Sequence, residues 1–184
     1  MKKKITAIII FICIAAAVFI IVRQTTVLNE AKAAAEEEST QAAFEKSVLF
    51  VTYANTYLSI DKNGVVCANS GQKPNDIPEL TGVEFENLEY AHQAEPKERS
   101  ALQYAIKVAE DLEKYNIEAD SIIYQNKRIT IKIGNLEIEL GKNEKTDDKI
   151  NDLNDLIDQI SGKSGTLYMQ NENSDNYGYT FREK

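Results

Sequence analysis

The sequence predicts an α+β protein in which two helices pack on a mostly antiparallel sheet, behind an N-terminal transmembrane helix. Three observations support this prediction. Residues 5–22 form an apolar run, residues 128–140 alternate between apolar and polar side chains, and residues 98–115 and 147–160 repeat apolar side chains at helical spacing. Alternation is typical of a sheet with one buried face, and helices with an apolar stripe can bury it on that face.

The apolar run from Ile5 to Val22 predicts a membrane-spanning helix. As a helix its eighteen residues would extend roughly 27 Å, enough for the core of a thin bilayer. Lys2–Lys4 precede the run, which predicts a cytoplasmic tail at residues 1–4 and a single-pass type II topology in the cell membrane. The alternative is a cleaved signal peptide. Ala15–Ala17 lies inside the run and Ala33–Ala35 lies far beyond it, so neither suits a cleavage site.

Two regions follow the predicted span. Residues 23–46 are rich in alanine and glutamate, which favours a helical juxtamembrane stalk, and residues 47–184 predict one extracytoplasmic domain. The formal net charge of the chain is −8, and setting aside the three N-terminal lysines leaves −11 outside the membrane. A surface this acidic argues against electrostatic binding of nucleic acid or anionic lipid.

The first part of the domain has the pattern of strands joined by turns. Residues 48–53 form a strand candidate. Residues 57–60 and 65–67 flank Asp61-Lys62-Asn63-Gly64, whose Asn-Gly pair suits a hairpin turn with positive φ. Ile77-Pro78-Glu79-Leu80-Thr81-Gly82 then predicts an extended segment that ends at a glycine.

Two amphipathic helices are predicted in the second part. In each, one face collects the apolar side chains, and Thr146 before the second helix is a suitable N-cap. The apolar faces are Leu102, Ala105, Ile106, Ala109 and Leu112 in residues 98–115, and Ile150, Leu153, Leu156, Ile157 and Ile160 in residues 147–160.

The remaining apolar runs predict strands. Residues 121–125, 128–133 and 136–140 form a three-strand meander between the helices, with turns at Asn126-Lys127 and Gly134-Asn135. After the second helix, two further runs predict the last strands, residues 165–170 and 177–181.

No catalytic set can be assembled from the sequence. His92 is the only histidine and lies in a polar connection, and the chain has no nucleophile elbow, phosphate loop or zinc-ligand cluster. Asp152, Asp155 and Asp158 have the spacing of a solvated helix face, without the glycine of a calcium loop. Cys67, the only cysteine outside the apolar run, is expected to be a small buried side chain. We therefore predict a protein that is not an enzyme and holds no metal or cofactor.

The order of these elements resembles the external β-domain of the bacterial cell division proteins FtsQ and DivIB. The hairpin with its Asp-x-x-Gly turn at residues 61–64 and the Pro-Gly segment after it match that family. So do Leu140-Gly141 at the end of a strand and Lys149-Ile150 early in the second helix. The resemblance covers residue 47 to about residue 170, although the family's Asp-x-Arg signal is missing from the strand at 167–170.

The resemblance implies a non-enzymatic scaffold of the division septum that binds FtsB/DivIC and FtsL through its external domain. Members of the family normally carry a POTRA domain between the anchor and the β-domain. Residues 23–46 leave no room for one, so we expect a reduced form. The alternative is an anchored pilin-like or other surface-structure subunit, although the chain lacks the Gly-Phe processing site of pilins.

The predicted last strand, residues 177–181, is the candidate interaction site. Tyr177, Tyr179 and Phe181 alternate along it and share one face. A terminal strand at a sheet edge offers backbone groups to another strand. In the family the end of the β-domain pairs with FtsB/DivIC, so the resemblance implies partner binding at Tyr177, Tyr179, Thr180 and Phe181. The alternative is that these aromatic side chains cover the domain's own core, and both can hold.

Overall fold

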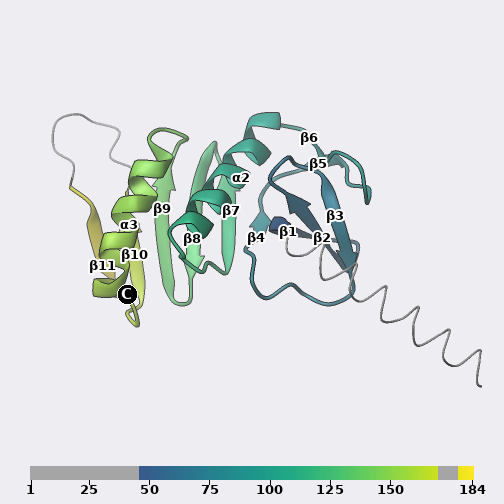
Figure 1. Cartoon of the computed structure of the whole chain (residues 1–184). Coiled ribbons are helices and arrows are strands. Elements are labelled where there is room, and N and C mark those ends of the chain that lie inside the picture. Colours follow the sequence, from purple (N-terminus) through teal and green to yellow (C-terminus); the bar gives the residue numbers. More distant parts are fainter. Residues whose placement is uncertain (1–45, 170–177) are drawn as a thin grey trace, which may run out of the picture. The chain divides into compact units, whose positions relative to one another are not determined.

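Residues 46–169 and 178–184 are described by a computed structural model, and they build one long sheet with two helices on one face (Figure 1). The predicted cytoplasmic tail, the predicted span at residues 5–22 and the stalk up to residue 45 lie outside the described residues. No helix within the described ranges has the length and apolar character needed to cross a membrane.

The sheet is mixed but mostly antiparallel, which confirms the predicted α+β class. Among the described strands its order is β11-β10-β9-β8-β7-β4-β1-β2-β3, and five of these eight neighbouring pairs are antiparallel. The strands are β1 (Ser47–Tyr53), β2 (Thr56–Asp61), β3 (Val66–Ser70), β4 (Glu79–Thr81), β7 (Ser121–Gln125), β8 (Arg128–Ile133), β9 (Leu136–Gly141), β10 (Gly165–Tyr168) and β11 (Thr180–Glu183). A separate small ribbon pairs β5 (Phe85–Asn87) with β6 (Glu95–Pro96).

The predicted hairpin turn is present between β2 and β3. The Asp61 carboxylate accepts hydrogen bonds from the backbone N–H groups of Asn63 at 2.8 Å and Val65 at 2.9 Å. Gly64 has φ +82°, the left-handed conformation that glycine adopts without strain. The side-chain hydrogen bonds of Asp61 and the left-handed conformation of Gly64 therefore set the register of this hairpin.

The Pro-Gly segment forms a central strand that the sequence analysis did not predict. β4 lies between β1 and β7, parallel to both, and so joins the β1–β3 part of the sheet to the part that begins at β7. Pro78 O accepts the N–H of Phe50 at 3.0 Å, and the N–H of Glu79 donates to Asp120 O at 3.1 Å. Gly82 follows with φ +82°, and a Cβ there would lie 2.0 Å from Tyr124 O. Only glycine fits this close approach of two backbones.

Two helices, α2 (Arg99–Lys114) and α3 (Thr146–Ile160), cover the same face of the sheet (Figure 1). The predicted apolar face of α2 is buried throughout. In α3, Ile150, Leu153 and Ile160 are buried, while Leu156 and Ile157 are half-buried. Both helices and the inward side chains of the sheet form one hydrophobic cluster. This cluster supplies most of the driving force for folding.

Two local predictions were wrong. Thr146 is not the N-cap of α3: Lys145 occupies that position in the left-handed region, and the Thr146 hydroxyl is buried and donates to Asn143 Oδ1 at 3.1 Å. Cys67 is half-buried instead of buried, because it alternates along β3 with the buried Val66 and Ala68, and its Sγ lies 3.2 Å from Ser47 Oγ.

Leu140-Gly141 and Lys149-Ile150, two of the residue pairs on which the family resemblance rests, lie in contact. Lys149 Nζ donates to Leu140 O at 2.8 Å, which ties the first turns of α3 to the end of β9. Gly141 follows with φ +87°, and its carbonyl oxygen accepts a hydrogen bond from the buried Tyr104 hydroxyl at 3.0 Å. These two bonds anchor both helices to the same strand end.

Candidate partner-binding edge

β11 is one edge of the sheet. It pairs antiparallel with β10 on one side, and no described strand lies beyond it on the other. The opposite edge, β3, is partly covered, because Val66 donates to His92 O at 2.9 Å and accepts from the N–H of Ala91 at 2.8 Å. Within the described residues β11 is therefore the more open of the two edges.

The hydrogen bonds of β10 determine which peptide groups of β11 face outward. Toward β9, the donors are alternate residues: Gly165 N bonds Asn135 O at 3.3 Å, and Met169 N bonds Glu139 O at 2.9 Å. Since peptide groups alternate in direction along a strand, the N–H and C=O groups of Thr166 and Tyr168 face β11, whereas those of Leu167 face β9.

The same alternation assigns the peptide groups of β11. Lys184 N donates to Ser164 O at 2.9 Å, and in the β10–β11 register Arg182 then also faces β10. The N–H and C=O groups of Phe181 and Glu183 point away from β10, toward the open side of the sheet. This side is what an added strand would meet.

The predicted site residues are only partly placed as expected. Tyr177 lies outside the described residues. Thr180 is exposed and begins β11, so the strand starts later than predicted, because its ladder begins at the Tyr168–Thr180 pair. Tyr179 and Phe181 are half-buried and pack against the hydrophobic cluster on the helix side of the sheet. These two aromatic side chains therefore contribute to the core.

β11 lies very close to β10 at Gly165. A Cβ at this position would lie 2.4 Å from Arg182 O and 2.8 Å from Phe181 Cζ, so the aromatic ring lies directly over the glycine. Lys163 Nζ lies 5.9 Å from the centroid of the same ring. On the opposite face, the Arg182 guanidinium lies 5.2 Å from the ring centroid of Tyr168. Contacts on both faces thus hold β11 to its neighbour.

Side-chain hydrogen bonds hold β11 at both ends. The Tyr179 hydroxyl donates to Asp152 Oδ2 of α3 at 2.5 Å, and Lys184 Nζ donates to Glu137 Oε2 of β9 at 2.9 Å. The bond from Lys184 lowers the pKa of Glu137 below its ordinary value. Helical spacing alone predicts a solvated position for Asp152, because that spacing does not show which distant residue it meets.

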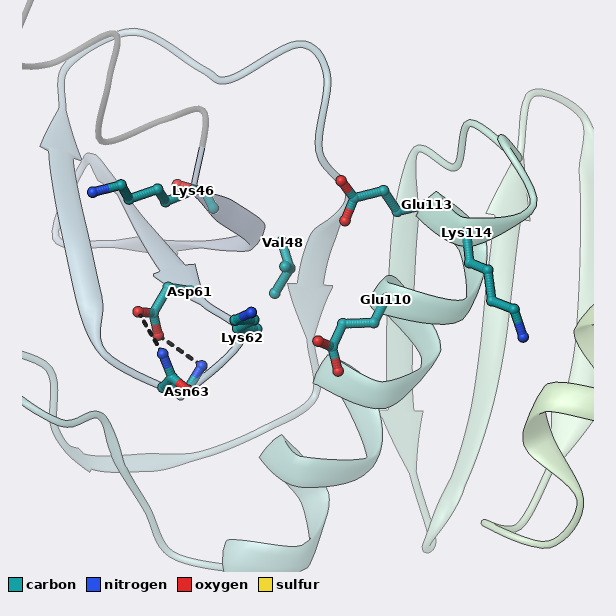
Figure 2. Close-up of a pocket in the computed structure, with 9 residues that line it drawn as sticks. Lys46, Val48, Asp61, Lys62, Asn63, Glu110, Glu113 and Lys114 are labelled. Atoms are coloured by element: carbon teal, nitrogen blue, oxygen red, sulfur yellow. Dashed lines mark hydrogen bonds between the residues drawn. The ribbon is translucent and has the colours of Figure 1, made fainter.

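A hollow of about 670 Å³ lies between the β2–β3 turn and α2 (Figure 2). Glu110 and Glu113 line it from α2, whereas Lys46 and Lys62 line it from the other side. Asp61 also lines it, but its carboxylate is occupied by the turn. This arrangement sets two glutamates against two lysines, with the Asp61 carboxylate already hydrogen-bonded within the turn.

Neither a metal centre nor a histidine site stands out in the described part of the chain. Its Asp, Glu, His and Cys side chains form no group of three that could hold an ion. His92 is exposed, and its Nδ1 lies 3.0 Å from Tyr90 O in the same loop. Within the described residues, the β11 edge presents outward backbone groups to which another strand could add.

Comparison with known proteins gave one result. The family model for the C-terminal region of the cell division protein FtsQ/DivIB matches residues 50–176. No curated protein and no solved structure matches the chain.

Proposed function

Because the chain belongs to the FtsQ/DivIB family of cell division proteins, we propose that it is a non-enzymatic scaffold of the division septum, anchored in the cell membrane by residues 5–22. In this proposal the external domain holds FtsB/DivIC together with FtsL. Family membership favours this role over the pilin-like alternative. The family match ends at residue 176, before β11, so the interface is assigned from the geometry of the edge.

The observation that supports the proposal is the open backbone of β11. Phe181 and Glu183 offer outward N–H and C=O groups at the end of a sheet of nine described strands. A partner strand that adds to this edge gains main-chain hydrogen bonds, and aromatic residues beside the edge add contact area. We propose Tyr179 as the energetic centre of the interface, with Tyr177, Thr180 and Phe181 as the other partner-binding residues.

Two proline substitutions test the proposed interface, because they remove amides that face opposite ways. Glu183→Pro removes an outward N–H and leaves the ladder to β10 in place, whereas Arg182→Pro removes an N–H that faces β10. We expect Glu183→Pro to reduce capture of the FtsB/DivIC–FtsL ectodomains without lowering the melting temperature. Arg182→Pro should disturb the strand itself. Thr180→Pro is uninformative about the partner, because that amide also faces β10.

The control for the lost carboxylate is Glu183→Ala, which should retain capture. If Glu183→Pro captures the partner as well as the unmodified chain does, the interface lies elsewhere. The cellular role is tested separately by a fluorescent fusion imaged in dividing cells. A ring at midcell supports the division role, and a uniform envelope signal or surface filaments contradict it.

A further inference from the structure

The attachment of β11 to the domain depends on few contacts. Its ladder to β10 comprises four residue pairs, from Gly165–Glu183 to Tyr168–Thr180. No described strand pairs with its other side. Fixing each residue of a terminal strand has a conformational-entropy cost, and a short ladder offsets that cost only partly. The side-chain hydrogen bonds at its two ends therefore contribute more to holding the strand on the sheet than they would for a central strand.

These two bonds lie on opposite faces of the sheet. Tyr179 reaches the helix side and donates to Asp152, which is half-buried on α3. Lys184 reaches the other face and donates to Glu137 on β9, which also lies 3.9 Å from Lys132 Nζ. One bond precedes the first residue of β11 and the other follows its last residue. Together they oppose displacement of the strand toward either face.

Neither acceptor belongs to the outward edge. Asp152 is on a helix above the sheet, and Glu137 is two strands away from the open side. A partner strand added to Phe181 and Glu183 would hydrogen-bond to β11 and not to these two carboxylates. Their effect on binding would act entirely through the position of β11.

We propose that Asp152 and Glu137 are positioning residues for partner capture, which hold β11 in place as a preformed edge before the partner arrives. This inference rests on the proposed function of the β11 edge. A partner that meets a strand already in position does not have to order it, and the apparent affinity then approaches the intrinsic one. If β11 is paired for only a fraction of the time, the apparent dissociation constant rises by the inverse of that fraction.

The test combines amide hydrogen exchange with partner binding on the purified full-length chain. The variants are Asp152→Ala, Glu137→Ala and the double variant, and Asp155→Ala is the matched control because it is exposed on the same helix. In the double variant, without partner, we expect the Arg182 and Lys184 amides to lose most of their protection. Exchange of core amides such as Ile131 should stay unchanged, which distinguishes local release of β11 from global unfolding.

Partner affinity should follow the exchange data. The double variant should bind the FtsB/DivIC–FtsL ectodomains at least about threefold more weakly, by a factor that matches the loss of paired β11. Asp155→Ala should match the unmodified chain in both measurements. Unchanged exchange, or lost protection without weaker binding, would overturn the inference.

Glu183→Pro separates this inference from the proposed function. If Glu183→Pro abolishes capture while the double variant binds normally, the edge is the interface and the positioning role is wrong. If capture survives in both, the interface itself is misplaced and both proposals fail.

Discussion

Replacing Gly82 by alanine should strongly destabilise the domain, because this glycine follows the central strand β4 and lies directly against the backbone of β7. Its φ is +82°, and a Cβ would lie 2.0 Å from Tyr124 O and 3.0 Å from Tyr124 C. A left-handed conformation costs an L-residue ~1–2 kcal/mol. The clash is with a carbonyl held in the sheet, and forced overpacking of this kind typically costs ~1–3 kcal/mol.

We therefore expect Gly82→Ala to lower the free energy of unfolding by ~2–5 kcal/mol, a large part of the ~5–15 kcal/mol of a typical domain. Gly162→Ala is the matched control, since its φ is +78° and a Cβ there would meet nothing within 4 Å. It should lose only the conformational part, ~1–2 kcal/mol. Urea unfolding of both variants measures the difference. Equal losses would refute the close approach of β4 and β7 at this glycine.

Four further outcomes are expected. Leu153→Asp buries an unpaired charge at a fully buried position, so it should cost several kcal/mol and leave the chain unfolded in a thermal melt. Tyr179→Ala should weaken partner binding by more than ~1 kcal/mol, measured by calorimetry beside a melt that checks folding. The Lys184 hydrogen bond lowers the pKa of Glu137 from its ordinary value of 4.5. The stability that this bond adds is therefore fully present above pH 4.5 and is lost as the pH falls through the lowered pKa. Exchange of β11 amides, corrected for intrinsic rates, should therefore speed up in acid, and a pH-independent protection would contradict this. Protease added to intact protoplasts should digest the chain beyond residue 23, and a mature N-terminus near residue 35 would contradict the type II topology.

The sheet and helices that depend on local periodicity could be predicted from the sequence. Ile129, Ile131, Leu136, Ile138 and Leu140 alternate with polar residues, and all five are buried. The spacing of a strand or an amphipathic helix is a short-range property, so neighbouring residues suffice to show it.

Features that depend on distant partners could not be predicted. β4 has only three residues and follows a proline, and it becomes a strand because β1 and β7 supply hydrogen bonds on both sides. Asp152 has the spacing of a solvated helix face, and only the folded chain brings Tyr179 to it. The edge position of the last strand was predicted, whereas the half-burial of Tyr179 and Phe181 depends on how α3 and β10 lie beneath them.

The most direct test of the account is the exchange of individual β11 amides with and without the FtsB/DivIC–FtsL ectodomains. In the isolated protein, the Phe181 and Glu183 amides should exchange quickly, while those of Arg182 and Lys184, which face β10, should be protected. Addition of the partner should protect Phe181 and Glu183 as a new strand pairs with the edge. If the partner binds while both amides continue to exchange at their free rates, capture by strand addition at β11 is wrong.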